Sequence, residues 1–173
     1  MNLIEKVLKT WYAQDDLRHF DPRHPAIKLA GEAGELLDLY GKHEYKPGFD
    51  WWRPGYESAL FQNRVPPVLD ELGDWFYYWR ILCYQDGNIA LDTLEQAGLK
   101  GDIFSLLTDL AKHSINLLVD YKNSQFINTE ELCLAGKVFL DILATLDCSI
   151  EKLAELNYQK LNRDVSHHGW KGA

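Results

Sequence analysis

The sequence has few cysteines and no long apolar run. Its three cysteines, Cys83, Cys133 and Cys148, are odd in number and far apart, and none belongs to a CxxC pair. This pattern disfavours a disulfide scaffold or a zinc site and predicts a reducing, cytoplasmic environment. No stretch approaches the roughly 20 apolar residues of a membrane helix, so we expect no membrane partner. The first residues, MNLIEKVLKTWYAQDD, lack the apolar core of a secretory signal, so we expect them to belong to the fold.

Positive charge is also scarce. The chain has 18 Lys and Arg against 26 Asp and Glu, a net charge of -8. Proteins that bind nucleic-acid polymers need a basic surface, so this balance argues against such a partner. It does not argue against a nucleotide enzyme, because carboxylates can hold metal ions that in turn hold phosphates. With 173 residues and 46% hydrophobic residues, the chain predicts one domain over 1–173 that folds without cross-links.

Strand signals are missing as well. No alternating apolar run is bounded by turn residues, whereas apolar residues recur at helical spacing almost throughout. The sequence therefore predicts an all-α fold, a helix bundle. Residues 21–25 and 43–64 read as loops, and the tail from 165 has no period. Asp102, Thr129 and Ser149 are candidate helix caps. The expected helices span 2–14, 26–42, 66–84, 89–97, 103–122, 130–147 and 150–163.

Two segments resemble each other within the chain. LAGEAGELLDLY (29–40) aligns with LAKHSINLLVDY (110–121), and GDWFYYWRIL (73–82) can be laid on GKVFLDILAT (136–145). One interpretation is that amphipathic helices share leucines at matching phase. The other is a duplicated hairpin that forms a pseudo-symmetric four-helix core. The second interpretation divides the chain into a metal-binding half, 26–97, and a degenerate half with a phosphate-binding helix, 102–163. The positions that then match Glu32, Glu35 and Asp74 are His113, Asn116 and Lys137.

Two pairs of carboxylates stand out. Glu32 and Glu35 project from one helix face at i, i+3 spacing, and Glu71 and Asp74 repeat the spacing on another helix. Such pairs are usually solvated, but here small residues flank the first pair and bulky aromatics follow the second. Four carboxylates turned toward each other would repel unless cations neutralised them. Oxygen ligands without Cys or His favour Mg²⁺, with Mn²⁺ as a substitute.

A third cluster lies near the end of the chain. Asn157, Lys160 and Arg163 share one helix face at three-residue spacing. Lysine and arginine at such positions can bind phosphate oxygens. The alternative is that these cations merely suit the last turn of a helix.

These motifs together resemble those of the MazG-like all-α nucleoside triphosphate pyrophosphohydrolases, which are related to dCTP pyrophosphatases and dimeric dUTPases. E32-AG-E35 and E71-LG-D74 are similar to the family's ExxE and ExxD metal helices, and N157-YQ-K160-LN-R163 is similar to its closing element. The resemblance implies Mg²⁺-dependent hydrolysis of a nucleoside triphosphate, in particular a dNTP, to monophosphate and pyrophosphate. It also implies a housecleaning or pool-control role and a homodimer. This sequence departs from the pattern by a long helical segment before the closing element.

The resemblance also implies a role for each candidate residue. Glu32, Glu35, Glu71 and Asp74 would bind metal, and Glu35, assisted by Glu32, would lie nearest the attacking water. The remaining candidates would bind the nucleotide: Lys160, Arg163 and Asn157 its phosphates, Lys28 a phosphate, and Tyr78, Trp51 and Trp52 its base. For Lys28 the alternative is a surface lysine, and for each aromatic residue it is packing in the core.

Other functions compete with this one. An acidic helical bundle could be a non-catalytic interaction protein, which predicts no inward carboxylate cluster and no dependence on Mg²⁺. An inactive homologue that binds nucleotide without turnover is a second alternative. A di-iron centre is disfavoured, because no histidine follows Glu35 or Glu71 at i+3.

Overall fold

The computed structural model describes residues 21–54 and 65–168, with side chains as far as Lys160. The expected helix 2–14 and residues 55–64 of the expected loop lie outside the described residues. The described part contains helices and no strand, so the prediction of an all-α helix bundle is confirmed. Among the described residues, no helix meets the length and hydrophobicity that a membrane-spanning helix needs. The elements are α2 (Arg23–Tyr45), α3 (Pro67–Gln85), the 3₁₀ helix η2 (Ile89–Glu95), α4 (Ile103–Ser124), α5 (Thr129–Thr145) and α6 (Ile150–His168).

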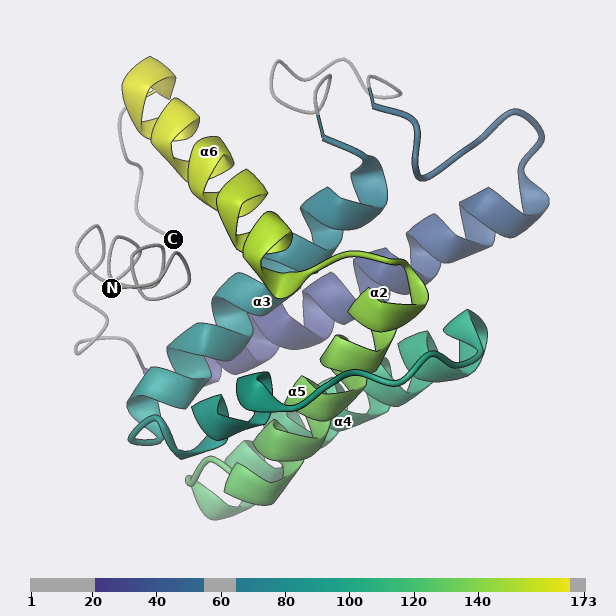
Figure 1. Ribbon diagram of the computed structural model, residues 1–173. Helices are drawn as coiled ribbons and strands as arrows, with labels where there is room; N and C mark the ends of the chain where they lie inside the picture. The colour runs from purple at the N-terminus through teal and green to yellow at the C-terminus, as the bar shows by residue number, and fades with distance from the viewer. Residues whose placement is uncertain (1–20, 55–64, 169–173) are drawn as a thin grey trace.

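Four helices form the body of the bundle (Figure 1). α2 packs against both α3 and α4, and α4 packs against α5. α2 runs antiparallel to α4, because Asp21 before α2 meets Tyr121 near the end of α4, whereas Tyr40 meets Phe104 at its start. α6 leaves this body, contacts α3 and projects beyond the bundle (Figure 1). The predicted closing element of the sequence is thereby brought back to α3.

Aromatic residues of α3 fill the core. Trp75 and Phe76 both stack on Phe139 of α5, with ring centroids 4.8 and 5.5 Å apart. The indole N–H of Trp75 donates to Ser114 Oγ at 3.0 Å, and that of Trp79 donates to the Leu132 carbonyl at 2.9 Å. Buried indoles usually need such acceptors. These bonds fix the rotation of α3 about its axis and therefore the direction in which its carboxylates point.

The two segments that resemble each other contribute to this same core. Phe76 and Phe139, which the alignment matches, have parallel rings with an interplanar angle of 1°. The matched leucines Leu29, Leu110 and Leu36 are all buried without solvent exposure. The duplication remains a prediction, since amphipathic helices of matching phase would bury the same positions.

Several helix boundaries differ from the expectations. The expected loop over 21–25 is confirmed only for Asp21 and Pro22, since α2 begins at Arg23 and Pro25 lies in its first turn. A proline is tolerated there because the first-turn N–H groups need no intrahelical acceptor. α6 continues to His168, past the expected end at 163.

The helix caps agree with the sequence except at one position. Asp102 accepts a hydrogen bond from the Ser105 N–H, and Ser149 Oγ accepts one from the Lys152 N–H, so both predicted caps are confirmed. At α5 the cap is Asn128 and not Thr129, because the Asn128 side chain accepts from the Glu131 N–H at 3.2 Å.

Candidate functional site

The antiparallel α2 and α3 bring three carboxylates together. Glu32 of α2 and Glu71 and Asp74 of α3 each offer one oxygen, and the three oxygens lie within 4.8 Å of one another. All three residues are only partly exposed. We call these three residues the acidic cluster. Glu35, the fourth predicted ligand, is an exposed residue whose carboxyl group lies close enough to Glu32 and Glu71 to share hydrogen bonds with them.

The electrostatic state of the acidic cluster reflects its burial. Burial, the charge of Asp74 and then that of Glu35 raise the pKa of Glu32 to about 7. Burial, a hydrogen bond with Glu35 and the charge of Asp74 raise the pKa of Glu71 to about 9. Burial also raises the pKa of Asp74 to about 6, although Lys160 opposes the change. Without a cation the acidic cluster therefore retains protons at neutral pH, which a divalent ion could replace.

Two oxygens of the acidic cluster lack a hydrogen-bond partner. Glu32 Oε2 and Glu71 Oε2 are buried atoms for which the described residues provide no donor, and Asn157 Oδ1 is a third such atom. Buried acceptors are rarely left unsatisfied, and a missing water or ion is a common explanation. Because the donors are hard carboxylate oxygens without Cys or His, they suit Mg²⁺ or Mn²⁺ better than zinc. The residues present thus fit the ion that the sequence implies.

Lys160 joins the acidic cluster from α6. Its Nζ lies 2.8 and 2.9 Å from the two carboxylate oxygens of Asp74, which is 86 residues away in the sequence. It also lies 2.9 Å from Asp70 Oδ1. Burial disfavours the charged lysine, but the two carboxylates outweigh that effect and raise its pKa. Lys160 therefore lies beside Asp74, one of the predicted metal ligands, although a long helical segment separates the two residues in the sequence.

Asp70 also belongs to the site, although it is not among the residues predicted from the sequence. It is 7% exposed, and its partner is Lys160. The signal for it was its position one turn before Asp74, which places both carboxylates on the same face of α3. That spacing alone could not reveal a lysine arriving from a distant helix.

Gly73 permits the close approach of α6. A Cβ atom at Gly73 would lie 2.6 Å from Nδ2 of Asn157, closer than ordinary contacts allow, and 3.4 Å from its Cγ, an ordinary contact. Asn157 is 4% exposed and packs directly across this glycine. Lys160 follows Asn157 by one helical turn. Asn157 therefore packs at the α3–α6 crossing, and Lys160 reaches the carboxylates.

The predicted base-binding residues lie in different environments. Tyr78 is half-buried and meets His24 edge-on, with ring centroids 6.4 Å apart. Trp51 is 3% exposed and stacks on His43 at 4.9 Å, which corresponds to the core-packing alternative. Trp52 is 36% exposed, so the prediction of base stacking now rests on Trp52 and Tyr78.

Two predicted phosphate-binding residues are not placed at the acidic cluster. Lys28 is exposed on α2, one turn before Glu32, as expected for the surface alternative. Arg163 belongs to the helical stretch of α6, but its side chain lies outside the described part of the structure.

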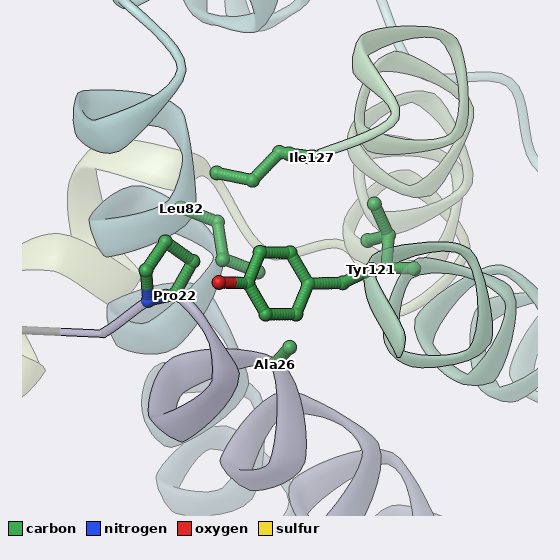
Figure 2. A pocket seen from close by; sticks show the side chains of 6 residues that line it. Pro22, Ala26, Leu82, Tyr121 and Ile127 are labelled. Atoms are coloured by element: carbon green, nitrogen blue, oxygen red, sulfur yellow. The ribbon is translucent and has the colours of Figure 1, made fainter. Parts of the chain in front are cut away.

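A hollow elsewhere in the bundle does not offer a ligand site. It is lined by apolar side chains of Pro22, Ala26, Leu82, Leu117 and Ile127, with the ring of Tyr121 at its centre (Figure 2). The Tyr121 hydroxyl donates to Asp21 Oδ1 at 3.1 Å. The space left between these side chains does not admit a water molecule.

Comparison of the chain with protein-family models, curated proteins and solved structures finds no match.

Proposed function

We propose that the chain is a Mg²⁺-dependent nucleoside triphosphate pyrophosphohydrolase of the MazG-like type. The observation that carries the proposal is the meeting of Glu32, Glu71 and Asp74 within 4.8 Å, with Lys160 arriving from a third helix. ExxE, ExxD and NxxK motifs that are remote in sequence contribute to one site, as the family resemblance requires. A deoxynucleoside triphosphate is the proposed substrate.

The same geometry counts against the alternative of an acidic interaction protein. In a surface chosen for solubility, carboxylates point to water and keep ordinary pKa values. Here one oxygen of Glu32 and one of Glu71 lie within 4.8 Å of each other, and burial raises the pKa of both groups. Partly buried carboxylates that lie close together are unfavourable when no cation is bound. A cation bound during function would explain why these carboxylates are brought together.

Glu32, Glu71 and Asp74 would hold the metal, with Glu35 beside them. A bound Mg²⁺ would neutralise charge on the triphosphate and acidify a water molecule. Glu35 is the most exposed of the four carboxylates and would accept the proton of the attacking water. Lys160 would bind oxygens of the departing pyrophosphate. The bond between the α- and β-phosphates breaks, and water supplies the oxygen that ends on one of the two products.

The test is incubation with each common dNTP and NTP, with Mg²⁺ or with a chelator, followed by chromatographic separation of the products. Monophosphate and pyrophosphate, formed only with metal, are the expected products. Glu71→Gln is expected to lose turnover. Asp38→Asn is a matched control, because Asp38 is 67% exposed and pairs with Lys42 on the surface of α2.

Two results would contradict the proposal. Diphosphate and phosphate as products would mean that a different bond is broken. Turnover that survives both chelation and Glu71→Gln would mean that the acidic cluster does not perform the reaction.

A further inference from the structure

Asp70 lies in the candidate site, but the proposed function gives it no role. It does not belong to the acidic cluster, although it lies on α3 one turn from Asp74. Its side chain is 6% exposed, and that of Lys160 is 14% exposed. A carboxylate buried to this extent needs a compensating charge, and Lys160 at 2.9 Å supplies it.

Asp74 belongs to two groups at once. It offers an oxygen to the acidic cluster and also holds the ammonium of Lys160 with both oxygens. A divalent cation bound to Asp74 would repel this ammonium at short range. Lysine has a long and flexible stem, so without a second anchor its ammonium would turn toward solvent.

We propose that Asp70 is a positioning residue for Lys160. It retains the ammonium beside the acidic cluster when a divalent cation engages Asp74, so that Lys160 meets the oxygens of the triphosphate. Asp70 itself touches neither the cation nor the nucleotide. This inference rests on the proposed function and extends it to the substrate side of the same site.

This proposal and a simple charge effect predict opposite changes in the affinity for a polyanion when Asp70 is removed. Asp70 is negative, so its removal alone would make the site more attractive to a polyanion. If Asp70 acts by holding Lys160, its removal weakens the binding of a polyanion instead. A third arrangement, in which Asp70 restrains Lys160 from reaching the phosphates, also predicts tighter binding after its removal.

The experiment is calorimetric titration with inorganic tripolyphosphate in the presence of Mg²⁺. The proteins are the wild type, Asp70→Asn, Lys160→Met, the double variant and Asp38→Asn. We expect Asp70→Asn to bind about tenfold more weakly, as does Lys160→Met, because an ion-paired hydrogen-bond donor is lost or misplaced. In the Lys160→Met background, Asp70→Asn should cause no further loss. Asp38→Asn, which removes the same charge from the surface, should bind no more weakly than the wild type.

Binding of Mn²⁺, measured separately by electron paramagnetic resonance, distinguishes two kinds of failure. A wild type that binds neither Mn²⁺ nor tripolyphosphate contradicts the proposed function and this inference together. A wild type that binds both, with Asp70→Asn binding tripolyphosphate equally well or more tightly, contradicts this inference alone. An equal loss in the Lys160→Met background also contradicts it, since Asp70 would then act without the lysine.

A second measurement uses only the wild-type protein, so it does not depend on whether a variant folds. The ammonium of Lys160 can be followed by ¹⁵N NMR in the wild type, because buried ion-paired lysines exchange their protons slowly. We expect its signal to remain protected when Mg²⁺ is added. Loss of protection on metal binding would show that Asp70 does not retain the lysine.

Discussion

Gly73→Ala tests whether α6 crosses α3 where the site requires it. The new Cβ would lie 2.6 Å from Asn157 Nδ2, so Asn157 or α6 has to move by about 1 Å to reach an ordinary contact distance. Overpacking of this kind costs about 1–3 kcal/mol. The higher helix propensity of alanine returns about 1 kcal/mol. The expected net change is a loss of up to about 2 kcal/mol in the free energy of unfolding.

Gly41→Ala is the matched control for this change. Gly41 is also an interior helical glycine, but its Cβ position has no neighbouring atom within 4 Å. Alanine there should therefore stabilise the protein by about 1 kcal/mol. Urea denaturation of both variants should show opposite signs. In an Asn157→Ala background, which removes the obstacle, Gly73→Ala should become stabilising. If Gly73→Ala and Gly41→Ala stabilise equally in the wild-type background, the Asn157 amide is not held against Gly73 as described.

Further predictions concern the carboxylates and the two tryptophans. Folded pKa values of Glu32, Glu71 and Asp74 are raised to about 7, 9 and 6, so the folded, metal-free protein holds more protons than the unfolded chain. In the presence of a chelator, the free energy of unfolding of the protein should thus fall as the pH rises from about 5 to about 9. Mg²⁺ should weaken or reverse this trend, because it binds the deprotonated groups. A flat profile in the chelator would contradict the burial of these carboxyls. Glu71→Gln should raise the melting temperature of the chelated protein at pH 8 and abolish the increase caused by Mg²⁺; an unchanged increase would exclude Glu71 as a ligand. Trp51→Ala should lower stability by about 3–5 kcal/mol in urea denaturation, because its ring is buried, whereas Trp52→Ala should change it by less than about 1 kcal/mol and raise the KM for the nucleotide. Equal effects of the two substitutions on stability would contradict the different placements of the rings.

The helices and the pairing of carboxylates on each helix could be predicted because both depend on local spacing. Apolar periodicity identified α2 through α6, and the i, i+3 spacing of Glu32 with Glu35 and of Glu71 with Asp74 placed each pair on one helix face. Small residues around the first pair and aromatics around the second indicated which faces were buried. The meeting of the two pairs then follows from one antiparallel packing of two helices.

Other features depend on contacts between distant segments, which spacing does not reveal. Asp70 reads as an ordinary surface acid until Lys160 is brought to it by the crossing of α6 over α3. Trp51 and Trp52 are adjacent in sequence and look alike there, yet only Trp51 stacks on His43 in the core. The loop expected over 21–25 includes Pro25, which the first turn of α2 accommodates.

The most direct test of the central claim is a crystal structure with Mn²⁺ and a non-hydrolysable deoxynucleoside triphosphate. Anomalous scattering locates Mn²⁺ without ambiguity. Our account predicts a peak about 2.0–2.3 Å from carboxylate oxygens of Glu32, Glu71 and Asp74, and a phosphate oxygen within hydrogen-bonding distance of Lys160. A triphosphate bound elsewhere, with no Mn²⁺ peak at these three carboxylates, would contradict it.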